Sequence, residues 1–146
     1  MILLIDIGNS NICFGLHDSK TLINTYRIKS MADKSADEYY IIFNNFVKEK
    51  IDDVVISSVV PTITSAIKKM VEKYYNISPK ILGVGMKTGL KIIADDPKTV
   101  GADLLCDIAG ASTYYNEAIV IDLGTASKFI YYKDNNPLYI VGFPSS

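Results

Sequence analysis

Near its N-terminus the chain reads Leu3-Leu4-Ile5-Asp6-Ile7-Gly8-Asn9-Ser10, and the pattern returns as Ala118-Ile119-Val120-Ile121-Asp122-Leu123-Gly124-Thr125-Ala126-Ser127. In both copies an apolar run ends in Asp-x-Gly followed by a small polar residue, and a run with aromatic residues comes next. Continuous apolar runs of this length are typical of buried strands. The repeat therefore predicts a duplicated module in which each copy opens with a strand.

The hydrophobic period changes several times between the two copies. Ser35-Ala36-Asp37-Glu38 forms a capping box, which predicts a helix start, and Pro61 suits the first turn of another helix. The expected elements are, in order, strands over 2–7, 12–16 and 21–28, a helix after the capping box, a strand over 54–60, a helix from Pro61, a strand over 80–84 and a helix over about 96–115. This order predicts an α/β fold with a mixed sheet.

We place the domain boundary at Asn116, where the pattern restarts. The first module is then residues 1–116, complete and ribonuclease-H-like. Residues 117–146 begin a second copy that stops after about three strands. Apolar residues on both faces of those strands predict a sheet that needs a cover, and self-association without one.

Composition excludes several classes of function. Fifteen basic and sixteen acidic residues give a net charge of −1, so no basic surface for nucleic acid is expected. No apolar run is long enough to span a membrane, and the N-terminus lacks a signal-peptide pattern. Cys13, Cys106 and a single histidine make no metal or disulfide spacing. We expect a cytoplasmic protein that acts on small molecules.

The Asp-x-Gly turns are the strongest candidates for chemistry. A glycine lets the backbone approach a ligand closely, and neighbouring amides and hydroxyls can cradle phosphate oxygens. An aspartate at a strand end can hold a metal ion, directly or through water. One copy alone would more simply be an ordinary turn between strands. Two copies, each opening one half of a duplicated module, favour a ligand site over an ordinary turn.

The motifs resemble a known family. Paired hairpins of this kind grip nucleotide phosphates in the actin, sugar kinase and Hsp70 superfamily. Within it, the two Asp-x-Gly loops resemble the phosphate loops of type III pantothenate kinases. Ser57-Ser58-Val59-Val60-Pro61, Gly89-Leu90-Lys91-Ile92 and Asp96-Pro97-Lys98-Thr99-Val100-Gly101-Ala102-Asp103 match further blocks of that family in the right order. The resemblance covers essentially the whole chain.

The resemblance implies ATP-dependent phosphorylation of pantothenate, the first step of coenzyme A biosynthesis, in a homodimeric enzyme. It implies that Asp103 is the catalytic carboxylate and that Asp6 serves Mg²⁺ and ATP. It further implies that Asp122 binds a monovalent cation, K⁺ or NH₄⁺. The implied ATP-binding residues are Asp6, Gly8, Asn9, Ser10, Asn11 and Thr125, and the implied pantothenate-binding residues are Gly101, Ala102, Asp103 and Leu104.

Three features depart from the family pattern. Leu104 stands where the family has an arginine, and Ala94 where it usually has a tyrosine. The sequence ends about where the family shows a glycine-rich segment, which predicts an impaired dimer interface. These departures keep alternatives open: a non-catalytic remnant or regulatory homologue of the kinase, or another small-molecule kinase of the superfamily. A transcriptional regulator is a weaker alternative, because the charge balance gives it no support.

Overall fold

The chain forms two compact units, residues Met1–Leu82 and Gly83–Ser146, in a computed structural model. The structure describes residues 1–83, 101–123, 126–134 and 136–144. Several residues named in the sequence analysis lie outside the described residues: the last residue of the strand expected over 80–84, the motif residues 89–92 and 96–100, Ala94 and Thr125. No helix among the described residues is long and apolar enough to cross a membrane.

The first unit is built on a five-stranded sheet with the order β3-β2-β1-β4-β5. The strands are β1 (Ile2–Ile7), β2 (Asn11–His17), β3 (Leu22–Lys29), β4 (Asp53–Ser58) and β5 (Lys80–Ile81). The first three form an antiparallel meander, whereas β4 pairs parallel to β1 and β5 parallel to β4. The carboxyl ends of β1 and β4 therefore lie side by side, because Ile7 is in register with Ser58.

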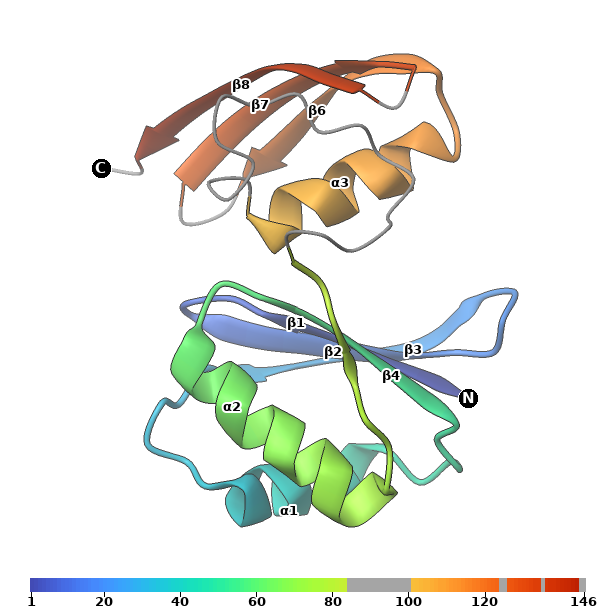
Figure 1. Cartoon of the computed structure of the whole chain (residues 1–146), viewed down its shortest axis with the longest axis vertical. Helices are drawn as coiled ribbons and strands as arrows, with labels where there is room; N and C mark the ends of the chain where they lie inside the picture. Colours follow the sequence, from blue (N-terminus) through green and yellow to red (C-terminus); the bar gives the residue numbers. More distant parts are fainter. Residues whose placement is uncertain (84–100, 124–125, 135, 145–146) are drawn as a thin grey trace. The chain divides into compact units, whose positions relative to one another are not determined.

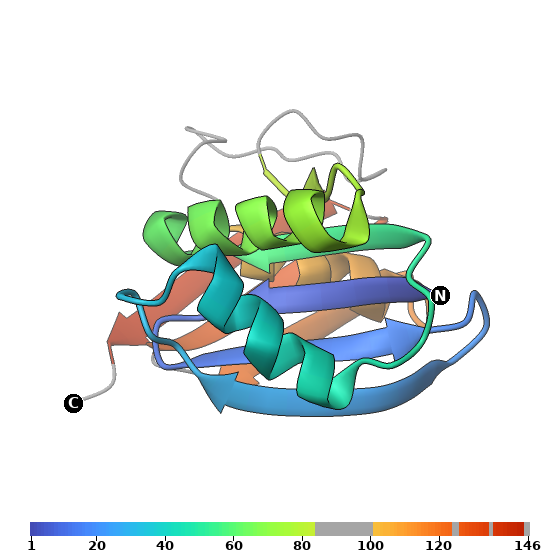
Figure 2. The same cartoon turned by 90° about the horizontal axis from the view of Figure 1, so that it is seen from below.

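Two helices cover one face of this sheet, α1 (Ala36–Phe46) and α2 (Pro61–Met70), the latter continued by the π-helical turn η1 (Val71–Tyr75) (Figures 1 and 2). The capping box predicted at Ser35 is confirmed, since its side chain and that of Glu38 each accept from the other's backbone amide. The covered face supplies the core, in which Phe14 stacks on Phe43 with ring centroids 4.2 Å apart.

The second unit pairs one helix with a three-stranded antiparallel sheet. Helix α3 (Ala102–Ser112) precedes β6 (Glu117–Leu123), β7 (Ala126–Lys133) and β8 (Asn136–Pro144), and the sheet order is β6-β7-β8. The helix packs on one face of the sheet through a small apolar core, formed by Leu104, Leu105, Ile108, Ile130 and Tyr132 with Ala111, Ala118 and Val120 at its margin.

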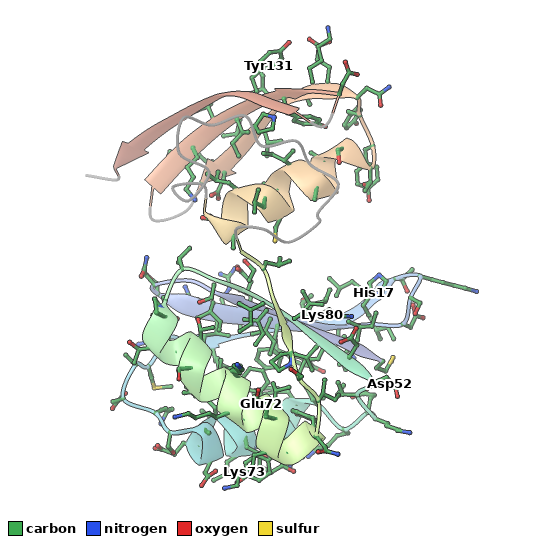
Figure 3. The ribbon with its side chains drawn as sticks, viewed as in Figure 1. His17, Asp52, Glu72, Lys73, Lys80 and Tyr131 are labelled. Carbon is green, nitrogen blue, oxygen red and sulfur yellow. The ribbon has the colours of Figure 1, made fainter. Side chains whose placement is uncertain are left out.

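Among the described residues of the second unit, no helix covers the other face of the sheet, which is called the open face here. Side chains alternate along β6, so Ala118 and Val120 face α3 while Ile119, Ile121 and Leu123 are exposed. Tyr131 on β7 points away from α3 on this open face (Figure 3), where its hydroxyl donates to Glu117 Oε1 at 2.5 Å. Strand β6 thus carries apolar side chains on both faces, as expected, but α3 covers one of the two faces.

The predicted α/β fold with a mixed sheet is confirmed, and the structure gives the sheet of the first unit five strands. The division of the chain differs from the expected boundary at residues 116 and 117. The structure divides the chain after Leu82, and α3 belongs to the second unit. The physical reason is that the apolar side of α3, with Leu105 and Ile108, is buried against Ile130 and Tyr132 of the second sheet.

Candidate functional site

The predicted phosphate loop joins β1 to β2 in the first unit. The Gly8 amide donates to the Asn11 carbonyl at 2.9 Å, and a Cβ on Gly8 would lie 3.2 Å from that oxygen. The turn is therefore close enough that a side chain at this position would push against the backbone. Asn9, Ser10 and Asn11 are exposed at its tip, and among the described residues the side chains of Asn9 and Ser10 make no hydrogen bond.

Ser30, which follows β3, holds this loop from the side. Its hydroxyl donates to the Gly8 carbonyl at 2.6 Å, and its backbone amide donates to the Ser10 carbonyl at 3.0 Å. These two bonds fix the backbone of the loop, and the backbone in turn determines where the side chains of Asn9 and Ser10 start. Sequence reasoning missed Ser30, because nothing in its local pattern signals a partner so far along the chain.

Asp6 lies on the sheet face opposite the helices of the first unit. Leu3, Ile5 and Ile7 of β1 are buried under the helices, so the alternation along the strand turns Asp6 the other way. Its register partners are Cys13 and Ser57. The Ser57 hydroxyl beside it is buried and has no hydrogen-bond partner among the described residues. The carboxyl ends of β1 and β4 thus carry a carboxylate and an unsatisfied hydroxyl on one face.

Asp103 lies in the first turn of α3, in the second unit. Its Oδ1 accepts from the Leu104 amide at 2.9 Å, one of the donors that a helix N-terminus leaves without an intrahelical acceptor. The helix dipole also favours a negative charge at this end. The side chain folds back over the N-cap residue Gly101, where a Cβ would lie 2.3 Å from Oδ1. Glycine at position 101 therefore makes room for the carboxylate.

Lys128 connects Asp103 to Asp122. Its ammonium is hydrogen-bonded to Asp103 Oδ2 and lies 3.1 Å from Asp122 Oδ2. Asp122 and Lys128 are direct partners across the β6-β7 hairpin. Burial alone lowers the pKa of Lys128, but the hydrogen bonds to Asp103 and Asp122 outweigh it and raise the pKa above its ordinary value. Sequence reasoning placed both aspartates in the site and missed the lysine between them.

The other two residues predicted to bind the substrate are largely buried. Leu104 is 8% exposed and packs in the apolar core of the second unit, and Ala102 is 7% exposed. The structure thus gathers Asp6 and the loop 8–11 in the first unit. It gathers Gly101, Asp103 and Asp122 in the second. Their roles as ATP, substrate or metal ligands stay predictions.

The two implied metal ions fit these residues differently. Mg²⁺ is commonly held by one or two carboxylates together with substrate phosphates, and Asp6 meets that requirement without a carboxylate cluster. A monovalent cation on Asp122 does not fit, because the Lys128 ammonium already contacts Asp122 Oδ2. Among the described residues no group of three or more His, Cys, Asp or Glu side chains could hold a metal ion.

Gly101→Ala tests whether the small N-cap residue is there for the carboxylate. The backbone at residue 101 has φ −63° and ψ 151°, which alanine adopts readily, so the free energy of unfolding should change by less than about 1 kcal/mol. The new methyl would displace Asp103 Oδ1 from the Leu104 amide. We expect faster hydrogen exchange of that amide with a melting temperature lowered by no more than a few degrees, measured by NMR and circular dichroism. A variant with unchanged Leu104 exchange would contradict this interpretation.

The chain matches a family of known proteins over most of its length. The model of a family described as type III pantothenate kinase matches residues 2–139. A type III pantothenate kinase from Citrifermentans bemidjiense is 41% identical over 138 residues, which is 90% of this chain and 54% of the relative. The chain therefore spans about half the length of the curated relatives it matches.

Solved structures support the fold alone, since their sequence identities are low. A protein described as a 2-dehydro-3-deoxygalactonokinase from Sinorhizobium meliloti aligns with a TM-score of 0.57 at 10% identity, covering 98% of this chain and 54% of that one. A ROK family glucokinase from Streptomyces griseus, solved with glucose and AMPPNP, aligns with a TM-score of 0.50 at 14% identity, covering 99% and 48%.

Proposed function

The chain belongs to the type III pantothenate kinase family, and we propose that it carries the phosphate loop and the catalytic carboxylate for phosphoryl transfer from ATP to pantothenate. The observation that carries this proposal is the arrangement around Asp103. Its carboxylate is fixed by the Leu104 amide and by Lys128, at the start of a helix whose N-cap glycine leaves room for it.

In the proposed reaction Asp103 accepts the proton of the pantothenate hydroxyl, or orients that hydroxyl toward the γ-phosphate. A bond forms between the hydroxyl oxygen and the γ-phosphorus, and the bond from that phosphorus to the bridging oxygen of ADP breaks. Little covalent chemistry is asked of the protein in such transfers, so positioning and electrostatics carry the catalysis. A positioned carboxylate suits both roles.

The loop 8–11 would hold ATP phosphates through its amides and the side chains of Asn9 and Ser10. Asp6 would hold Mg²⁺, which neutralises charge on the phosphates when bound. Thr125 of the second Asp-x-Gly turn is proposed as a further phosphate ligand from the family resemblance. The pantothenate contacts proposed for Gly101, Ala102 and Leu104 rest on the same resemblance, as do cytoplasmic location and homodimer formation.

Turnover tests the proposal. Because the chain spans half of its relatives, we would assay it alone and as a hybrid, defined here as residues 1–146 followed by the C-terminal half of a curated relative. ADP release would be followed with pantothenate, sugars and short hydroxy acids as acceptors. Turnover of pantothenate supports the proposal. A folded, ATP-binding hybrid without turnover favours the non-catalytic homologue, and turnover of another acceptor favours a different small-molecule kinase.

ATP binding by the 146-residue chain gives a separate prediction. We expect weak binding that requires Mg²⁺, far below that of a full-length relative, because about half of the proposed phosphate donors are expected to be poorly fixed in the 146-residue chain. Asp6→Ala should abolish the Mg²⁺-dependent part, and Asp33→Ala, which removes another exposed carboxylate of the first unit, should not. Calorimetry that finds tight binding unchanged in Asp6→Ala would refute the role of Asp6.

A further inference from the structure

Two carboxylates in the second unit share one ammonium. Asp103 comes from the first turn of α3, Asp122 from β6 and Lys128 from β7, and the side chains of the three are 32%, 31% and 22% exposed. Lys128 stands opposite Asp122 in the strand register, so the sheet itself determines where the lysine stem begins. The ammonium then reaches the helix start as well.

We propose that Lys128 is a positioning residue: its ammonium fixes the Asp103 carboxylate and is the built-in cation that Asp103 and Asp122 share, in place of a bound K⁺ or NH₄⁺. The catalytic consequence rests on the proposed function, since it requires that Asp103 act on the substrate hydroxyl. The positioning itself is a property of the second unit and can be measured without turnover.

The geometry supports positioning over mere stabilisation. A partly exposed ion pair contributes little to stability, with a median of about 0–1 kcal/mol. Here, however, each Asp103 oxygen has its own donor, Leu104 N on Oδ1 and Lys128 Nζ on Oδ2. Rotation of the carboxylate would break both bonds. Lys128 therefore restricts rotation of the Asp103 carboxylate, which an aspartate at a helix start with only one donor could still undergo.

The same geometry argues against a separate cation on Asp122. Nζ of Lys128 lies 3.1 Å from Asp122 Oδ2, and a second positive ion at that oxygen would be repelled by the ammonium. Two carboxylates with one lysine leave a net charge of −1, whereas without the lysine the pair would carry −2 and attract a cation from solution. Loss of Lys128 should therefore create a dependence on small cations that the parent chain lacks.

The second unit offers a matched control. Lys133 also lies on β7, pairs directly with Glu117 across the same hairpin, and contacts Glu117 Oε2 at 3.2 Å. Lys128→Met and Lys133→Met each remove one ammonium from one cross-strand ion pair and keep a long apolar stem. Only the first reaches Asp103. An effect of general charge or sheet stability should appear in both variants, whereas an effect through Asp103 should appear in one.

The readout is hydrogen exchange of the Leu104 amide, measured by NMR at constant ionic strength with choline, K⁺ or NH₄⁺ as the chloride salt. The parent 146-residue chain and its variants all carry Ile121→Lys, because Ile121 is exposed on the open face and a charge there should keep the chains monomeric. For the parent and Lys133→Met we expect the same protection in all three salts. For Lys128→Met in choline we expect exchange roughly three- to tenfold faster, the scale of one ordinary hydrogen bond, with partial recovery in K⁺ or NH₄⁺. Lys128→Arg, which keeps the charge, should behave like the parent.

Either of two results would overturn the proposal. Unchanged Leu104 exchange in folded Lys128→Met would show that the lysine does not hold Asp103, and K⁺-dependent protection in the parent or in Lys128→Arg would show that the site takes a cation despite the positive side chain. If Lys128→Met does not fold, Lys128→Arg alone decides through its salt dependence. Absence of turnover in the hybrid would refute the proposed function and leave these exchange results standing.

Discussion

Asp103→Asn is expected to lower the turnover of the hybrid by roughly 10²–10⁴-fold, the range typical for loss of a general base. Asparagine keeps an oxygen that can accept from the Leu104 amide, so the helix start should survive. It cannot accept the substrate proton and loses the charge that pairs with Lys128. The affinity for ATP, measured by calorimetry, should change little, because Asp103 is not among the proposed phosphate ligands.

A matched control is Asp134→Asn, which changes a carboxylate just beyond β7 in the same unit. Its turnover should equal that of the parent hybrid. Parent-like turnover in Asp103→Asn would remove Asp103 from the reaction. A large loss in both variants would indicate that charge in the second unit, rather than the particular carboxylate, governs turnover.

A protein consisting of residues 1–146 is expected to self-associate through the open face of its second sheet. Ile119, Ile121 and Leu123 are 65%, 56% and 76% exposed on that face, and Phe129 lies opposite Ile121 in the register. Burying a side chain of this size contributes about 1.5–3 kcal/mol, and contiguous exposed apolar patches mark association surfaces. Light scattering should therefore report oligomers at micromolar concentration.

Ile121→Lys should shift this protein strongly toward the monomer, because it places a charge at the centre of the open face. The control is Ile41→Lys, since Ile41 is 64% exposed on α1 in the first unit. It should leave the oligomers unchanged. A monomeric parent, with slow amide exchange across β6, would contradict the expectation.

The structure also indicates where a shorter chain should end. A chain ending at Leu82 keeps the first unit whole, whereas a chain ending near Asn116 would keep α3 without the second sheet that covers its apolar side.

Much of the fold could be predicted because its signals are local. The apolar run before Asp6 predicts β1, and the capping box at Ser35 predicts the start of α1, from residues adjacent in sequence. The packing partner of α3 could not be predicted in this way. Its apolar side, with Leu105 and Ile108, suits either sheet, and only the tertiary structure places it on the second.

The candidate site divides along the same line. Asp6 and Asp122 could be identified because each ends an apolar strand in a repeated motif. Asp103 is identified only through the resemblance of residues 96–103 to a segment of the family, since a charge near a helix start is by itself ordinary. Lys128 could be found only from the register of the β6-β7 hairpin. If the Asp-x-Gly turn is taken as the turn of a hairpin, Lys128 is the residue opposite Asp122 and therefore a candidate partner. Ser30 offered no such signal, since its bonds to the Gly8 and Ser10 carbonyls join different strands.

The most direct test of the central claim is to look for the product. The hybrid would be incubated with ATP, Mg²⁺ and pantothenate, and the mixture analysed by mass spectrometry for pantothenate heavier by one phosphoryl group. We predict that this product appears in step with ADP and requires ATP. In Asp103→Asn its rate of formation should fall by roughly 10²–10⁴-fold. A folded hybrid that binds ATP and yields no phosphorylated pantothenate would contradict the claim that these residues carry the kinase reaction.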